Sequence, residues 1–459
     1  MFDLIIVGAG VAGAAAATAF SRQGRQVLLI ERTLKEPDRI VGELLQPGGV
    51  DALQALGLGH CLQGIDAIPI EGYHLYWKDE EASFWFCEQN GKKPEGRSFH
   101  HGRFVAKLRA AAKAEPNVTV LEATVLEILR DAKSGNVVGV ACSTDEEDHA
   151  RYFAPLTILA DGSSSNFRSQ FTPHKPKAVS RFWGLEMLDA PLPIPRYAHS
   201  VLGRGPPVLM YPIGTRETRI LVDIPNSIHD RLGNSNAVRS YLLECVAPTV
   251  PKSVRPKFEH AIWKGRLRNL PNSWAPSTRN KTAGLILLGD ALNMRHPVTG
   301  AGMTVALKDV VLLSRVLNTI DVPSFEDTKE VLLKMRAFHL RRKGHSASLN
   351  MLAQALYFLF ASKGMFPNRT SVDIMQFGFI RYVQEGESRF AVPAWIMGGV
   401  ETNVLLLFYH FFHVAVFSIG LHFRQSGPWD FLGALIRSLG VLATAIHIIW
   451  GPLVGELQP

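Results

Sequence analysis

Residues 3–20 read DLIIVGAGVAGAAAATAF, and this stretch decides the fold of the amino-terminal part of the chain. The apolar run Leu4 to Val7 is typical of a buried strand, and the alanine-rich run Ala14 to Phe20 is typical of a helix. A glycine-rich turn connects the two. Strand, turn and helix in this order predict the first βα unit of a dinucleotide-binding fold.

The turn has the pattern G-x-G-x-x-G, formed by Gly8, Gly10 and Gly13. Gly8 permits the tight turn, Gly10 lets a pyrophosphate approach the backbone, and Gly13 allows the helix to pack closely on the strand. A second predicted strand, Gln26 to Ile30, ends at Glu31, eighteen residues after Gly13. A carboxylate at this place can accept hydrogen bonds from both ribose hydroxyls of an adenosine, so the segment predicts an NAD or FAD site.

Two distant segments favour FAD over NAD. A predicted strand, Leu156 to Ala160, leads into Asp161, and another, Leu285 to Leu288, leads into Gly289 and Asp290. The sequence Gly300-Ala301-Gly302-Met303 then opens a helix. Asp290 could bond a ribityl hydroxyl, and the helix N-terminus could face the pyrimidine edge of a flavin, where negative charge collects on reduction.

The composition limits which kinds of site and partner the chain can have. The chain has 459 residues, a net charge of +8 and four scattered cysteines with no metal-ligand spacing, so we expect neither a disulfide framework nor a metal site. The positive charge is compatible with nucleic acid, an anionic membrane surface or an anionic cofactor. Cores for two or three domains fit this length.

The carboxyl-terminal residues are unusually apolar. Val404 to Phe423 contains no Asp, Glu, Lys or Arg, and Phe431 to Val454 contains only Arg437. Each run is long enough to cross a hydrocarbon layer as a helix, and the break at Gln425 to Pro428 predicts a helical hairpin. We expect this hairpin to contact a membrane rather than to form a buried helix pair. Whether its helices span the membrane or lie in one leaflet stays open. Since no signal peptide is visible at the N-terminus, the tail is the expected attachment.

Four further segments narrow the family. They are residues 35–43 (KEPDRIVGE), 45–49 (LQPGG), 100–104 (HHGRF) and 288–304. Together with the glycine-rich turn, they resemble the squalene epoxidases (squalene monooxygenases), which belong to the flavoprotein monooxygenases of the p-hydroxybenzoate hydroxylase type. The likeness runs from residue 3 to about residue 360, and the hydrophobic tail belongs to the same pattern.

The resemblance implies an activity. Members of this family epoxidise squalene to (S)-2,3-oxidosqualene in sterol biosynthesis, using O2 through a C4a-hydroperoxyflavin. Their electrons come from NADPH through a separate reductase of the NADPH-cytochrome P450 reductase type. The resemblance further implies FAD as cofactor, membrane lipid as surroundings and no nucleic-acid partner. It places the chain on the cytosolic face of the endoplasmic reticulum membrane, attached through the C-terminal helices, with lipid droplets as a second location.

Two other functions stay open at this point. A flavin-dependent isoprenoid reductase of the geranylgeranyl type has the same fold but saturates double bonds without consuming O2. A membrane-associated protein that binds flavin without catalysis is the alternative of another class. Product analysis with and without oxygen separates these readings.

The resemblance also carries the site residues. The expected cofactor-binding residues are Gly8, Gly10, Gly13, Glu31, Arg32, Arg39, Arg109, Asp161, Asp290, Gly300, Gly302 and Met303. Gln46 and Tyr73 match the family pair beside the substrate pocket, and Tyr73 is the one expected catalytic residue, linked to the positioning of the flavin. From sequence alone, Arg109 could equally be a solvated helix charge or a ligand of phosphate, and Asp161 could be a simple turn residue.

These observations predict an α/β chain with three parts. A Rossmann-like FAD-binding domain is expected from residues 1–65, 97–178 and 275–345. A β-sheet substrate domain is expected from residues 66–96 and 179–274. Residues 346–459 are expected to form a hydrophobic helical region associated with the membrane.

Overall fold

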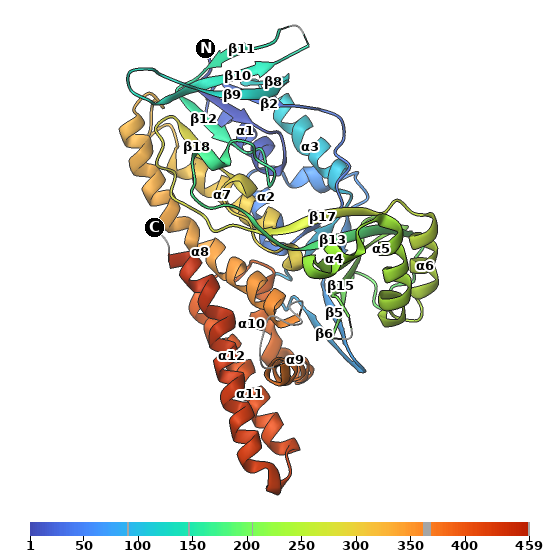
Figure 1. The fold of residues 1–459 in the computed structure, drawn as a ribbon. Helices are drawn as coiled ribbons and strands as arrows, with labels where there is room; N and C mark the ends of the chain where they lie inside the picture. The colour runs from blue at the N-terminus through green and yellow to red at the C-terminus, as the bar shows by residue number, and fades with distance from the viewer. Residues whose placement is uncertain (90, 146, 204, 361–368, 458–459) are drawn as a thin grey trace.

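The first layer of the molecule is a five-stranded parallel sheet with the strand order β18-β12-β1-β2-β8. The structure, a computed structural model, describes residues 1–89, 91–145, 147–203, 205–360 and 369–457 (Figure 1). The strands are β1 (Leu4–Val7), β2 (Val27–Glu31), β8 (Val118–Glu122), β12 (Leu156–Leu159) and β18 (Leu285–Leu287). The three central strands read as continuous apolar runs because both faces of the sheet are covered.

Helices pack around this sheet, and α1 (Val11–Ser21) is the most buried of them. Its run of alanines lets it lie closely between α3 (His101–Ala114) and α7 (Gly302–Val316), which it contacts. α2 (Pro47–Ala55) packs on α7. Two small antiparallel sheets flank this layer: β9 (Thr124–Arg130), β10 (Val137–Ser143) and β11 (Ala150–Phe153), and β3 (Leu44–Leu45), β4 (Ile68–Ile70) and β7 (Gly96–Ser98).

The second layer is a seven-stranded sheet with the order β17-β13-β16-β15-β14-β5-β6. Its strands are β5 (Gly72–Trp77), β6 (Glu80–Trp85), β13 (Lys177–Leu188), β14 (Tyr197–Leu202), β15 (Val208–Pro212), β16 (Glu217–Pro225) and β17 (Arg268–Trp274). The pair β5 and β14 is parallel, and the other neighbours are antiparallel.

Both faces of the second sheet are buried, as alternating side chains show. Trp183 points into a core shared with α4 (Asn226–Leu232), α5 (Ser235–Tyr241) and α6 (Arg255–Lys264), whereas its neighbour Phe182 points into a core shared with the C-terminal helices. The second of these faces also borders the cavity described below.

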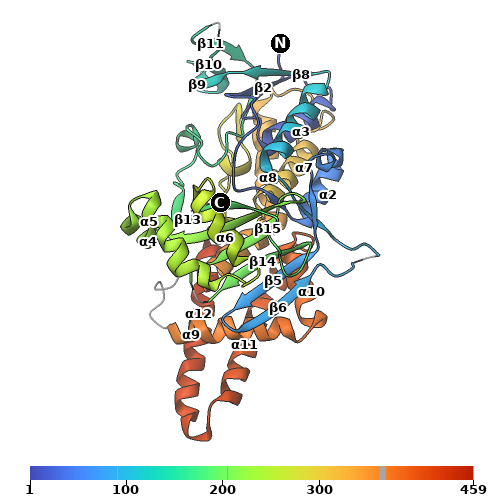
Figure 2. The same cartoon turned by 90° about the vertical axis from the view of Figure 1, so that its right-hand side faces the viewer.

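Among the described residues of the C-terminal part are the helices α8 (Thr328–Phe360), α9 (Arg369–Gln384), α10 (Glu387–Met397), α11 (Val404–Gln425) and α12 (Phe431–Leu457). Residues 361–368 and 458–459 of the predicted third region lie outside the described residues. Helices α11 and α12 pack on each other, and their connecting turn points away from the rest of the molecule (Figures 1 and 2). Both are long and apolar enough to cross a membrane, and 17% and 39% of their most apolar windows are buried.

The structure confirms the predicted fold class, a mixed α/β chain with apolar C-terminal helices. The predicted domain boundaries stay predictions. Further short helical turns lie at Gly59–Leu62, Arg168–Gln170, Leu242–Val246, Ala247–Thr249, Gly289–Ala291, Pro297–Thr299 and Pro428–Asp430.

Candidate functional site

A large cavity lies between the two sheets. Its empty volume is about 1470 Å³, part of which is open to solvent. One end is lined by loops at the carboxyl ends of the parallel strands, among them Gly10 and Asp290. The other end is lined by Phe182, Leu221 and Leu270 from the second sheet.

The three glycines of the first turn have different reasons to be glycine. Gly8 has a φ of +98°, and a Cβ there would lie 2.6 Å from the carbonyl oxygen of Ala160. A Cβ on Gly13 would lie 1.9 Å from the carbonyl oxygen of Gly8. A Cβ on Gly10 would meet no atom within 4 Å, and Gly10 lines the cavity. The fold therefore requires Gly8 and Gly13, whereas Gly10 keeps space open for a ligand.

Two helix N-termini border the same cavity. The lining includes Gly10 and Val11 at the start of α1, and Gly302 and Met303 at the start of α7. A Cβ on Gly302 would meet no atom within 4 Å. The first N–H groups of a helix have no partner within the helix, and the helix dipole adds partial positive charge. Both ends are therefore suited to bind anionic or electron-rich groups.

Glu31 and Arg109 support the first turn from outside the cavity lining. The backbone N–H of Ala9 donates to Glu31 Oε2 at 2.8 Å, and Arg109 Nη2 lies 3.3 Å from the same oxygen. Arg109 Nε donates to the carbonyl oxygen of Ala9 at 2.8 Å, and Nη1 donates to the carbonyl oxygens of Thr33 and Lys35 at 3.1 Å each. Burial lowers the pKa of Arg109, and the negative charge of Glu31 opposes this effect.

The sequence left two readings of Arg109 open, and the structure shows it half-buried with backbone partners instead of as a solvated charge. Its predicted contact with phosphate stays a prediction. Arg32, the neighbour of Glu31, is exposed.

Asp161, Asp290 and Arg39 come together near the cavity. Arg39 and Asp290 line it, with Nη2 and Oδ2 4.0 Å apart. The Nε atom of Arg39 is buried without a hydrogen-bond partner in the described structure. Burial raises the pKa of Asp161, and a hydrogen bond from Ser165 partly opposes this effect. The unused donor on Arg39 is the kind of group that a bound phosphate or ribityl chain would satisfy.

Sequence reasoning missed Arg168, which ties the two acid-bearing loops together. Its Nη2 donates to the carbonyl oxygens of Gly162 at 2.9 Å and Asp290 at 2.7 Å, and its Nε donates to that of Ala291 at 3.0 Å. The side chain is buried, and burial lowers its pKa. A lone arginine seven residues after Asp161 was the available signal, but its partners Asp290 and Ala291 lie more than a hundred residues away.

Gln46 and Tyr73, expected beside the substrate pocket, lie in direct contact. Gln46 Nε2 donates to Tyr73 Oη, and it also donates to the carbonyl oxygen of Thr299 at 2.6 Å. Tyr73 lines the cavity and stacks on Phe84, with ring centroids 5.2 Å apart. Burial raises the pKa of Tyr73, so its hydroxyl stays neutral. Because Gln46 takes an acceptor position on this oxygen, the hydroxyl hydrogen is free to point elsewhere.

The residues present fit FAD. The open positions at Gly10, Gly162 and Gly302 leave backbone surface that a cofactor can approach closely, and both helix N-termini lie beside it. A pyrophosphate suits the start of α1, and the electron-rich edge of a flavin suits the start of α7. The apolar end of the cavity then stays available for a second, hydrophobic molecule.

Comparisons with known proteins agree with this reading. The family model described as squalene epoxidase matches residues 153–436, and the model for glucose inhibited division protein A matches residues 3–179. The squalene epoxidase of Aspergillus fumigatus is 47% identical over 98% of this chain and 92% of its own length. The squalene monooxygenase of Mus musculus is 39% identical over 99% of this chain and 78% of its own length.

Solved structures share the fold at low identity. A probable FAD-dependent monooxygenase from Pseudomonas aeruginosa, PqsL, superposes with a TM-score of 0.60 at 20% identity, covering 78% of this chain and 94% of its own.

Proposed function

The chain belongs to the squalene epoxidase family, and we propose that it catalyses the FAD-dependent epoxidation of squalene to (S)-2,3-oxidosqualene in sterol biosynthesis. The observation that carries this proposal is the two-ended cavity. One end has the open glycines and helix N-termini of a dinucleotide site, and the other is lined by apolar side chains. An alkene bound at the apolar end would lie next to the flavin end.

Bound FAD would supply the activation of O2, and the side chains supply binding, orientation and a dry environment. Gly10 and the start of α1 would hold the pyrophosphate, and the start of α7 would face the pyrimidine edge. Phe182, Leu221 and Leu270 exclude water from the apolar end. A reaction that uses a reactive oxygen species benefits from this exclusion because water would divert it.

The remaining site residues follow from the resemblance to the family, and Arg39, Asp290, Gly300, Gly302 and Met303 also line the cavity. Glu31 and Arg32 would bind the adenosine end, and Arg39, Arg109 and Asp290 would lie along the phosphates and ribityl chain. Asp161 would hold the flavin loop, and Gly300, Gly302 and Met303 would border the isoalloxazine ring. The three-part division of the chain follows the same assignment: residues 1–65, 97–178 and 275–345 would bind FAD, residues 66–96 and 179–274 would bind squalene, and residues 346–459 would form the membrane-associated helical region.

Tyr73→Phe should lower kcat about five- to tenfold, while the Kd for FAD stays unchanged. The change removes only the hydroxyl that Gln46 contacts, and a hydrogen bond of this kind contributes about 0.5–1.5 kcal/mol. Steady-state turnover and FAD titration measure the two quantities. An unchanged kcat, or a fall in kcat that a weaker affinity for FAD accounts for, would show that the Tyr73 hydroxyl has no role in the reaction.

The partner and the location are further parts of the proposal. Electrons would come from NADPH through a separate reductase of the cytochrome P450 reductase type. The helices α11 and α12 would attach the chain to the cytosolic face of the endoplasmic reticulum membrane, and also to lipid droplets. A membrane location suits an enzyme whose substrate is a thirty-carbon hydrocarbon, since exposing each CH2 group to water costs about 0.8 kcal/mol.

The experiment is product analysis of squalene incubations with NADPH and reductase, under air and under argon. We expect oxidosqualene under air and no product under argon. Reduced polyprene under argon would favour an isoprenoid reductase instead. Bound flavin without any turnover would favour a non-catalytic flavin-binding protein.

A further inference from the structure

Arg295 is a buried arginine that holds together both ends of the segment 293–302, which borders the cavity. Its Nη2 donates to the carbonyl oxygen of Asn293 at 3.2 Å and to Asn293 Oδ1 at 2.8 Å. Its Nη1 donates to the carbonyl oxygens of Ala301 at 3.4 Å and Gly302 at 3.3 Å, at the start of α7. The guanidinium therefore fixes the loop that leads into the proposed flavin-facing helix.

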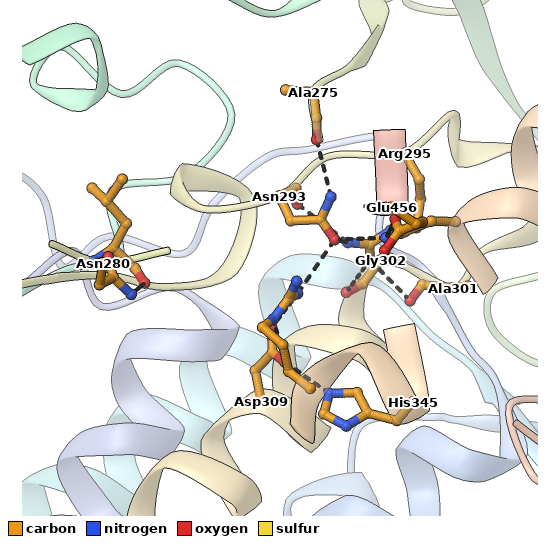
Figure 3. A network of polar contacts seen from close by, with 12 residues as sticks. Ala275, Asn280, Asn293, Arg295, Ala301, Gly302, Asp309, His345 and Glu456 are labelled. Atoms are coloured by element: carbon orange, nitrogen blue, oxygen red, sulfur yellow. Dashed lines mark hydrogen bonds and ion pairs between the residues drawn. The ribbon is translucent and has the colours of Figure 1, made fainter. Parts of the chain in front are cut away.

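Asn350, on α8, connects Arg295 to Glu456 near the C-terminal end of α12. Its Oδ1 accepts from Arg295 Nε at 2.7 Å, and its Nδ2 donates to Glu456 Oε1 at 2.7 Å and to Asn293 Oδ1 at 3.0 Å. The orientation of this amide is chemically required, because a guanidinium offers only donors and a carboxylate only acceptors. Figure 3 shows Glu456 beside Arg295, whose guanidinium bonds Asn293.

Three carboxylates, Asp290, Asp309 and Glu456, lie near Arg295, and Glu456 is joined to it through a shared hydrogen-bond partner, Asn350. Asp309 already accepts two hydrogen bonds from Arg342, at 3.1 and 2.8 Å, and lies 2.7 Å from His345 Nε2. Burial lowers the pKa of Arg295 to about 10, and the negative charges of Asp290, Asp309 and Glu456, in decreasing order, oppose this effect. Arg295 therefore stays charged near neutral pH, and each of its hydrogen bonds described above is to a neutral oxygen.

Glu456 has an unusual place for such a role. It lies in the last turn of α12, whose only other Asp, Glu, Lys or Arg is Arg437, and α12 packs on α8. The carboxylate is partly buried and bonded to an asparagine that is 3% exposed. A glutamate needed only for solubility at a helix end would face water instead.

We propose that Glu456 is a positioning residue for the cofactor loop, acting through Asn350 and Arg295 on the segment 293–302. That segment would keep its FAD-binding form only while the last turn of α12 lies against α8. The second helix of the apolar hairpin would thus complete the cofactor site as well as contact lipid. This inference rests on the proposed flavin function.

The test is a titration of the full-length apoprotein, purified in detergent, with FAD. Glu456→Ala should raise the Kd for FAD about tenfold, the effect of one charge-assisted hydrogen bond. Asn350→Leu should raise the Kd for FAD to a similar extent. The Kd of the double variant should be no higher than that of the single variant with the higher Kd, because both substitutions interrupt the same hydrogen-bonded pathway. Glu330→Ala, which removes a partly buried glutamate 3.6 Å from Lys334 on α8, is the matched control and should bind FAD normally.

A second readout distinguishes positioning from general stability. Glu456→Gln keeps the hydrogen-bond acceptor and removes the charge, so it should fold, bind FAD within about threefold of the unmodified chain and shift the midpoint potential of the flavin to a more positive value. A wild-type Kd in Glu456→Ala would overturn the inference, even if the melting temperature of the apoprotein falls. So would an equal loss in Glu330→Ala. If the unmodified chain binds no FAD, the proposed function itself fails.

Discussion

Gly10→Val should give a folded chain that carries almost no flavin, with the Kd for FAD raised at least about a hundredfold. The backbone at Gly10 is extended, with φ −77° and ψ −165°, which valine adopts readily. Its side chain would enter open space in the cavity, where no protein atom lies within 4 Å of the new Cβ. The protein should tolerate this change, whereas a pyrophosphate needs that space. Visible flavin absorbance per mole of protein and the melting temperature of the apoprotein measure the two effects.

Gly13→Ala is the matched comparison in the same turn. Its Cβ would lie 1.9 Å from the carbonyl oxygen of Gly8, so helix α1 could not keep its distance from β1. We expect poor folding and a lower melting temperature even without cofactor. If Gly10→Val binds FAD as the unmodified chain does, the pyrophosphate does not lie on this turn.

The double variant Val416→Lys, Leu439→Lys should move the chain from the membrane fraction to the soluble fraction. Val416 on α11 is 58% exposed and Leu439 on α12 is 60% exposed, so lysine should not disturb the fold. In the middle of a membrane-inserted helix each lysine costs about 2.5–3.5 kcal/mol, and the pair about 5–7 kcal/mol. Fractionation of cells, followed by detection of the chain in pellet and supernatant, measures the change.

The control is a lysine substitution at an equally exposed leucine on another helix. Leu333→Lys alters a side chain on α8 that is also 60% exposed, and this variant should stay in the membrane fraction. A double variant that remains with the membrane as fully as the unmodified chain would show that another surface attaches the protein.

Local patterns were sufficient for the fold class and for a dinucleotide site, whereas the choice of FAD over NAD needed segments far apart in the sequence. Strand, glycine turn, helix and acid follow one another within residues 3–31, and each is set by short-range geometry: positive φ at Gly8 and close packing at Gly13. The length and apolarity of α11 and α12 are equally local properties, and the structure forms both helices.

Long-range partners could not be predicted in this way. Asn350 and Glu456 are separated by 106 residues, and Arg168 and Ala291 by 123, so no spacing in the sequence joins them. Arg109 shows the same limit: its place on a helix was predictable, but its backbone partners at Ala9 and Thr33 depend on how three segments pack. The direct contact of Gln46 with Tyr73 likewise depends on the approach of α2 to the second sheet.

Isotope labelling tests the proposed chemistry directly. The purified chain, a P450-type reductase and NADPH are incubated with squalene under labelled oxygen gas, and the products are analysed by mass spectrometry. We expect oxidosqualene that carries one labelled oxygen atom, and none when the chain lacks FAD. An unlabelled oxygenated product, or a polyprene with fewer double bonds and no oxygen, would contradict the proposal.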